Sequence, residues 1–191
     1  MIQLRITTKV GALVVEIYED RAPQTAEHFL RYVDKGYYNG ATFYRTLRSP
    51  ENQPNNAIKI DLIEGGFYND YYENAMKTDL INGRPYDESR GRKGPHPLIL
   101  LERTDETGIK HLDGTISLGR TSPDSVDDAF IICVGDQPEL DAGGKRHPDG
   151  LGFPAFGKVV KGMDVVRQIH GMEAEGQKII SEVEIISIAR E

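Results

Sequence analysis

Apolar and polar residues alternate along two short stretches near the start of the chain, on either side of a glycine. The first stretch is residues 4–8 and the second is residues 12–18, with Gly11 between them. A period of two residues is typical of a strand with one buried face, and glycine is favoured in the turn between two strands. This pattern predicts a β-hairpin.

The next stretch has the period of an α-helix. Pro23 and Thr25 are favoured where a helix begins, and Gly36 is favoured just after a helix ends. Between them, apolar residues recur three and four positions apart, namely Ala26, Phe29, Leu30 and Val33. We therefore predict a helix that begins near Pro23 and ends at Gly36.

Short apolar stretches predict the remaining strands. They are residues 43–47, a strand that begins at residue 58 and ends at Gly65-Gly66, and residues 97–101, 114–118, 130–134, 155–160 and 179–188. A short helix is predicted over residues 163–169. About eight strands and two short helices, without regular alternation of strand and helix, indicate a mainly β protein. We predict a closed, eight-stranded antiparallel barrel with two short helices capping its ends, because closure leaves no unpaired strand edge. A β-sandwich is the alternative.

Three segments rich in glycine, proline and polar residues interrupt this pattern. They lie near residues 48–57, 67–95 and 135–154, and such composition is typical of surface loops. The chain has 191 residues, of which 38% are hydrophobic, which suits one domain with a full-sized core. We predict a single domain over residues 1–191 with these three loops inserted.

Charge and composition restrict the partners. The net charge of −7 repels nucleic-acid phosphates, so we predict no nucleic-acid partner. No stretch approaches the ~18 apolar residues that a membrane span requires. Cys133 is the only cysteine and lies in an apolar stretch, so we expect a buried, unreactive thiol. Absence of an internal disulfide favours a reducing compartment. We predict a cytoplasmic monomer that does not bind membranes.

Metal and cofactor patterns are missing from the sequence. The aspartates between residues 124 and 136 lack the glycine and closing glutamate of a calcium loop. His111 and His147 have no histidine or cysteine at the spacing of a zinc site. No glycine-rich phosphate-binding motif occurs. We predict no metal and no cofactor.

An arginine and a carboxylate lie near the ends of two successive predicted strands. Arg45 ends the motif Phe43-Tyr44-Arg45, and Glu64 precedes the pair Gly65-Gly66. If the two strands are neighbours, these side chains form a polar pair on a β-scaffold.

Ordered segments along most of the chain resemble the cyclophilin family of peptidyl-prolyl isomerases, including bacterial members. They are residues 18–29 (YEDRAPQTAEHF), 36–45 (GYYNGATFYR), 65–66 (GG), 114–120 (GTISLGR), 130–133 (FIIC) and 156–166 (FGKVVKGMDVV). The resemblance implies a cyclophilin-like barrel and an enzyme, a rotamase that accelerates isomerisation of X-Pro bonds during protein folding. Its partners would be proline-containing peptides or unfolded proteins.

The same resemblance implies roles for individual residues. Arg45 matches the family's arginine, which donates a hydrogen bond toward the prolyl nitrogen and so stabilises the twisted amide. Glu64 would orient Arg45, and both are predicted as catalytic. The predicted substrate-binding wall consists of Leu62, Leu118, Gly119, Phe130, Ile131, Leu140 and Phe153.

Several positions depart from the family pattern. Glu64 replaces a glutamine, and a carboxylate would neutralise Arg45 and weaken it as a donor. Asp61 falls where an apolar aromatic is usual, although Ile60 could substitute for it, and Ile131 replaces a phenylalanine. These changes leave a second hypothesis, a proline-peptide binding or chaperone-like module with little turnover. A small-ligand barrel is a third, weaker hypothesis.

Overall fold

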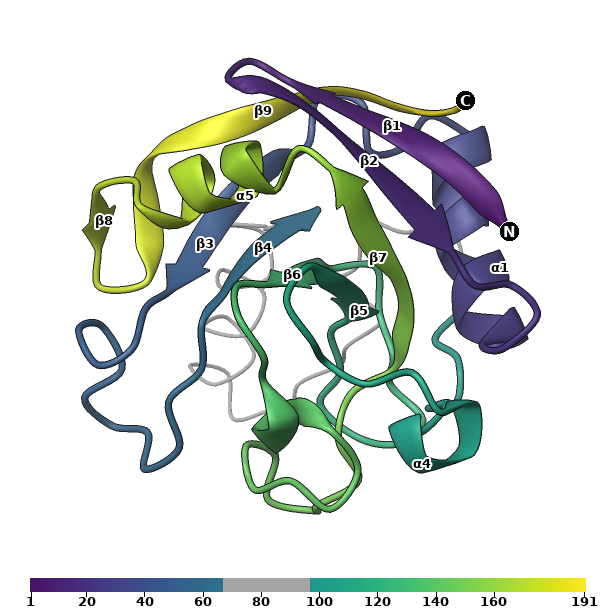
Figure 1. Cartoon of the computed structure of the whole chain (residues 1–191), viewed down its shortest axis with the longest axis vertical. Helices are drawn as coiled ribbons and strands as arrows, with labels where there is room; N and C mark the ends of the chain where they lie inside the picture. The colour runs from purple at the N-terminus through teal and green to yellow at the C-terminus, as the bar shows by residue number, and fades with distance from the viewer. Residues whose placement is uncertain (67–96) are drawn as a thin grey trace, which may run out of the picture.

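The computed structural model describes residues 1–66 and 97–191. Eight strands close into an antiparallel barrel in the order β1-β2-β7-β5-β6-β4-β3-β9, and β9 pairs with β1 to complete the ring (Figure 1). The strands are β1 (Ile2–Thr8), β2 (Gly11–Ile17), β3 (Thr42–Leu47), β4 (Leu62–Gly66), β5 (Thr115–Leu118), β6 (Phe130–Cys133), β7 (Ala155–Lys161) and β9 (Lys178–Arg190). A two-residue strand, β8 (Ala174–Glu175), pairs only with β9. The predicted barrel is confirmed.

The predicted hairpin at the start of the chain is β1 and β2. Ile2 pairs with Ile17 at its open end and Thr8 pairs with Gly11 at the turn. Gly11 has a φ of +146°, and a Cβ there would lie 2.7 Å from a methyl group of Val165. Glycine is therefore needed both for the turn and for the close approach of the following helix.

Two helices pack against different strands of the barrel. Helix α1 (Pro23–Asp34) contacts β7 and β9, and helix α5 (Met163–His170) contacts β2, β3 and β4. Pro23 lies in the first turn of α1, and Gly36 follows its end with a φ of +67°, as the sequence predicted. Within the described residues, no helix is long and apolar enough to cross a membrane.

Two predicted strands are wrong in extent. Residues 58–61 do not belong to a strand, because the side chain of Gln53 forms two hydrogen bonds with the backbone of Ile60 in place of a neighbouring strand. Residues 97–101 contribute only a single bridge, Ile99 with Val126. A one-turn helix, α4 (Thr104–Thr107), was not predicted. The predicted loop at 67–95 lies outside the described residues.

Alternation along β4 and β6 separates two hydrophobic clusters. Ile63, Phe130 and Ile132 lie in the barrel interior with residues of α1 and α5. The alternate residues point outward, and with neighbouring loop residues they form what we call the outer cluster, which comprises Leu47, Ile60, Leu62, Ile131, Cys133, Leu140 and Phe153. The period of two residues thus fills the core and builds an apolar patch on the outer wall.

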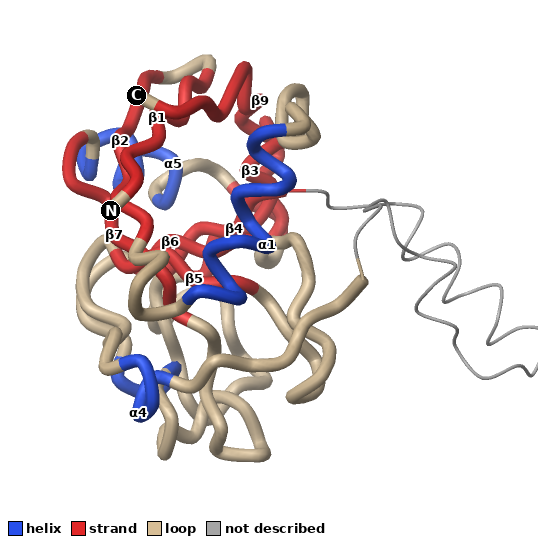
Figure 2. The backbone as a smooth tube through the Cα atoms, turned by 90° about the vertical axis from the view of Figure 1, so that its right-hand side faces the viewer, coloured by secondary structure: helices blue, strands red, loops and turns tan. Residues whose placement is uncertain are grey.

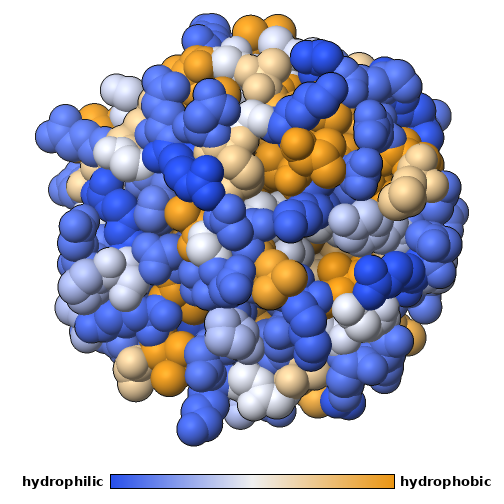
Figure 3. Space-filling view, viewed as in Figure 1, coloured by the Kyte–Doolittle hydropathy of each residue, from blue (hydrophilic) through white to orange (hydrophobic). Residues whose placement is uncertain are grey.

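Loops gather at one end of the barrel. Figure 2 shows them beyond β5 and β6, on the side away from β1 and β9. On the face shown in Figure 3, hydrophilic side chains predominate and hydrophobic residues are exposed only in small areas between them. Apolar residues on that face therefore form no continuous surface across it.

Candidate functional site

A cavity of about 330 Å³ lies against the outer cluster. Its lining contains most of the predicted site residues, namely Arg45, Leu62, Glu64, Gly119, Ile131, Leu140 and Phe153. Leu47, Ile60, Arg120, Thr121, Asp127 and Arg146 complete it. The cavity therefore has an apolar floor from the outer cluster and a charged, polar rim.

Two predicted substrate-binding residues do not line this cavity. Leu118 and Phe130 are 0% exposed and belong to the interior cluster. Phe130 contacts the rings of Phe29, Tyr38 and Phe43 inside the barrel. Their side chains are core residues, and the predicted substrate contact is corrected for both. The reason is the alternation on β6, which directs Ile131 outward and Phe130 inward.

Arg45 and Glu64 are neighbours on adjacent strands. They are cross-strand partners of β3 and β4, next to a bulge that begins after Phe43. Arg45 Nη1 donates to Glu64 Oε2 over 2.9 Å, and the Arg45 and Glu64 side chains are 39% and 15% exposed. The predicted pair is thus formed, and the arginine is the more accessible of the two.

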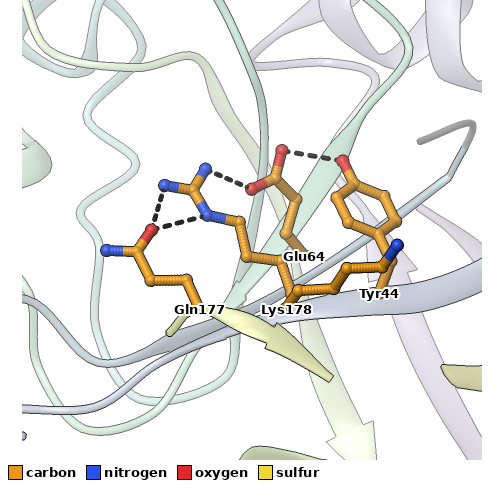
Figure 4. A pocket seen from close by; sticks show the side chains of 5 residues that line it. Tyr44, Glu64, Gln177 and Lys178 are labelled. Atoms are coloured by element: carbon orange, nitrogen blue, oxygen red, sulfur yellow. Dashed lines mark hydrogen bonds and ion pairs between the residues drawn. The ribbon is translucent and has the colours of Figure 1, made fainter. Parts of the chain in front are cut away.

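Gln177 provides the second support of Arg45, and sequence reasoning missed it. Its Oε1 accepts hydrogen bonds from Arg45 Nε at 2.9 Å and from Arg45 Nη2 at 2.5 Å (Figure 4). Gln177 Nε2 donates in turn to the backbone oxygen of Asn52. Gln177 precedes β9, far from Arg45 in the sequence, so only the pairing of β3 with β9 brings them together.

Tyr44 holds the other oxygen of Glu64. Its hydroxyl donates to Glu64 Oε1 over 2.8 Å. Burial raises the pKa of Tyr44 well above its usual value, and the charge of Glu64 raises it further, so the phenol stays protonated. Tyr44, Arg45, Glu64, Gln177 and Lys178 also line a second hollow of about 250 Å³, shown in Figure 4. Both hollows share Arg45 and Glu64.

Three hydrogen bonds fix the guanidinium of Arg45 in one orientation. A guanidinium carries five N–H groups, and the bonds to Glu64 and Gln177 use three of them. Among the described residues, one N–H on each terminal nitrogen therefore remains for another acceptor. The arrangement is a positioned, partly exposed donor beside an apolar floor.

The opposite wall of the cavity is built by loops around Phe153. The guanidinium of Arg120 lies 5.3 Å from the centre of the Phe153 ring, and its side chain is 0% exposed. Asp149 accepts two hydrogen bonds of 2.8 Å from Arg120. These bonds hold the pKa of Asp149 well below its usual range. The Arg120–Asp149 ion pair therefore supports Phe153, the loop residue of the outer cluster.

His147 lies behind Phe153. Its ring makes an edge contact with Phe153 at 5.8 Å, and its nitrogens contact Asp149 and the backbone oxygen of Thr121. The side chain is 19% exposed. His147 is therefore partly buried, and it supports the wall without lining the cavity.

The other polar candidates behave as structural residues. Within residues 1–66 and 97–191, no group of three or more histidine, cysteine, aspartate or glutamate side chains could hold a metal ion. Cys133 is free and buried, and burial raises the pKa of its thiol, so it is poorly reactive. Of the two positions considered for the missing aromatic, Ile60 lines the cavity. Asp61 instead accepts a hydrogen bond from the backbone of Ser49.

The fold and cavity define a class of protein: a closed β-barrel that presents an apolar site and an oriented arginine on its outer wall. A family model described as cyclophilin type peptidyl-prolyl cis-trans isomerase matches residues 3–190. The chain therefore belongs to the cyclophilin family, as the motifs predicted.

Individual relatives agree with this membership. Peptidyl-prolyl cis-trans isomerase B of Escherichia coli is 30% identical over 166 residues, which cover 86% of this chain and 82% of the relative. Peptidyl-prolyl cis-trans isomerase A of Dickeya dadantii is 29% identical over 171 residues, covering 89% and 72%. A solved cyclophilin of Cryptosporidium parvum superposes with a TM-score of 0.69 at 19% identity, covering 100% of this chain and 97% of the other. The last likeness shows the fold alone.

Proposed function

We propose that this protein is a peptidyl-prolyl cis-trans isomerase in which Arg45 is the catalytic residue and the outer cluster binds the proline ring. The observation that carries this proposal is the position of Arg45, whose oriented guanidinium lies at the rim of a cavity floored by Leu62 and Ile131. Relatives named as isomerases support the same activity.

The chemistry requires no covalent step. An X-Pro bond rotates slowly because the twisted amide loses resonance, which gives a barrier of about 18–20 kcal/mol. The nitrogen of the twisted amide regains a lone pair that can accept a hydrogen bond. A free N–H of Arg45 would donate to this nitrogen and stabilise the transition state more than the planar ground state. The apolar floor would hold the ring and exclude water.

A proline-peptide binding module with little turnover is the second function considered from the sequence. The contact of Glu64 with Arg45 at 2.9 Å is the observation in its favour, because the carboxylate compensates the charge of the donor. The relatives are named as isomerases, and this alternative is therefore not favoured.

We further propose that the substrates are proline-containing segments of unfolded proteins, and that the protein acts as a cytoplasmic monomer without nucleic-acid or membrane partners. The single buried cysteine and the net charge of −7 support this setting. Localisation of the tagged protein in its own cells would test it.

The isomerase proposal is tested with a short peptide that contains one X-Pro bond. Exchange between its cis and trans forms is measured by NMR with and without the protein, since the uncatalysed exchange takes tens to hundreds of seconds. We expect the exchange rate to rise in proportion to protein concentration. Folded protein that binds the peptide without raising the rate would contradict the proposal and support the binding module.

A further inference from the structure

Arg146 is a charged residue of the cavity rim that the reaction outlined above does not use. It lies in the loop after the short turn Pro138–Leu140 and lines the same cavity as Arg45. Its Nη1 donates over 2.6 Å to the backbone oxygen of Ile58, a neutral acceptor. Because this acceptor is neutral, the bond does not compensate the positive charge of Arg146.

No carboxylate within residues 1–66 and 97–191 forms an ion pair with Arg146. Glu139, whose backbone oxygen accepts a hydrogen bond from the Arg146 N–H, uses its carboxylate to accept one from the backbone of Lys145. Burial lowers the pKa of Arg146, and the charge of Arg45 lowers it further, as expected where two cations share one cavity. Arginine nevertheless stays protonated at neutral pH.

The other cations of the rim are compensated. Arg45 is paired with Glu64, and Arg120 is paired with Asp149. Asp127 is the remaining acid of the lining. Its Oδ1 accepts a hydrogen bond from the backbone of Ala129, and the backbones of both residues bond to Gly119. Within the described residues no carboxylate pairs with Arg146, so its positive charge is the one on the rim that no ion pair compensates.

The geometry points to Arg146 as a specificity-determining residue that favours X-Pro substrates with an acidic side chain next to the proline. This inference rests on the proposed isomerase function. With the ring on the outer cluster, the residue before or after proline must cross the rim. A carboxylate there would replace water around a guanidinium that has no ion pair within the described chain. Partial burial makes such a pair stronger than one in open solvent.

The test compares peptides that differ only in charge. Two pairs are used, one with Glu or Gln before the proline and one with Glu or Gln after it, and kcat/KM is measured for each peptide at low ionic strength. For the wild-type protein we expect the Glu peptide of at least one pair to be preferred about five-fold. Added salt should reduce this preference, because salt screens the attraction.

Variants of neighbouring cations separate the rim charge from the net charge. In Arg146→Gln the preference should fall to about one, and Arg146→Lys should keep part of it. Lys145→Gln removes an equal charge from the adjacent position, which does not line the cavity, and should leave the preference unchanged. The ratio of the two peptides cancels any general loss of stability or activity.

Two results would overturn the inference: no preference for Glu in either pair, or a preference that persists in Arg146→Gln. Failure of the isomerase proposal gives a different result, since no peptide would then be turned over. Binding of the same peptides, followed by fluorescence anisotropy, would still show whether Arg146 selects the acidic member of each pair.

Discussion

The two sides of the cavity are built in different ways. On one side, adjacent strands hold Arg45, Leu62, Glu64 and Ile131 at fixed register through backbone hydrogen bonds. On the other side, Phe153 lies in a loop outside the strands. The loop is held by scattered contacts, such as the bond from the Phe153 N–H to the Leu140 oxygen and the ion pair of Arg120 with Asp149. The first side is fixed by the sheet, whereas the second is fixed by irregular backbone bonds and side-chain pairs.

Because of this difference, we expect the strands to support the catalytic step and the loops to select the substrate. A hydrogen bond to a transition state requires a donor held within a fraction of an ångström, which strands provide. Selection among substrates tolerates looser geometry and can change with loop sequence. We therefore expect substitutions on the strand side to change kcat, and substitutions on the loop side to act on KM and on stability.

The largest effect is expected from Arg45→Ala. Removal of one oriented donor to a transition state lowers kcat by about 100- to 1,000-fold. Because the Arg45 side chain is 39% exposed, the barrel should remain folded. The rate of X-Pro exchange is measured beside circular dichroism. Arg45→Lys keeps the charge without the planar fork and should recover little of the rate. A wild-type kcat in Arg45→Ala would show that the strand side of the cavity does not supply the catalytic donor.

The strand side was largely predictable from the sequence. Period-two alternation gave the barrel, and the FYR and EGG motifs gave Arg45 and Glu64 on neighbouring strands. The same alternation, applied to residues 130–133, would have placed Phe130 and Ile131 on opposite faces of the strand, so that only one of them could face the site. The prediction followed the motif and assigned both residues to the site.

The loop side and Gln177 could not be read in the same way. Gln177 reaches Arg45 only because β3 pairs with β9, and nothing near residue 177 indicates that contact. Arg120 and Asp149 pair, and Arg146 reaches the cavity, through loop conformations that have no period. Residues 58–61 of the predicted strand are wrong for a related reason, since one side chain, Gln53, supplies hydrogen bonds that a strand would have used.

Asp149→Asn is expected to have the second-largest effect, on stability. Arg120 is 0% exposed and would lose its charged partner, which costs about 2 kcal/mol of unfolding free energy. Urea unfolding measures this loss. KM should rise because Phe153 loses its anchor, whereas kcat should change less. A larger fall in kcat than rise in KM would show that the loop side also positions the reacting groups. Asp124→Asn, which removes an exposed aspartate outside the cavity lining, is the control.

The same ion pair gives a pH dependence. Arg120 lowers the pKa of Asp149 in the folded protein, so the folded state binds this proton less readily than the unfolded state. The contribution of Asp149 is therefore complete above the unfolded pKa of about 3.9 and is lost as the pH falls through the lower, folded value. The free energy of unfolding of the wild-type protein and of Asp149→Asn is measured with urea at neutral pH and below pH 3. The difference between the two proteins should be smaller in acid. An equal difference at both pH values would show that Asp149 is not the group responsible.

Gln177→Ala is expected to have a smaller effect, confined to kcat. Arg45 would lose the acceptor of its Nε and Nη2 groups but keep its bond to Glu64. Looser orientation should lower kcat about ten-fold with little change in KM. Gln168→Ala, on the exposed face of α5, controls for loss of a glutamine near the same end of the chain. A rise in KM with kcat unchanged would make Gln177 a substrate-binding residue.

Glu64→Gln is expected to have the smallest effect, and in the opposite direction. The glutamine oxygen can still accept from Arg45 Nη1, and its NH₂ group can donate to the oxygen of Tyr44, so the orientation is kept. The negative charge is lost, which leaves the guanidinium a stronger donor to the prolyl nitrogen. We expect kcat to rise about three-fold, equivalent to roughly 0.6 kcal/mol of barrier.

An unchanged kcat in Glu64→Gln would show that Glu64 does not weaken Arg45, whereas a fall would show that the carboxylate is needed to hold the donor in place. Tyr44→Phe separates these two cases, because it leaves the charge of Glu64 intact while removing one of the two bonds that fix its position.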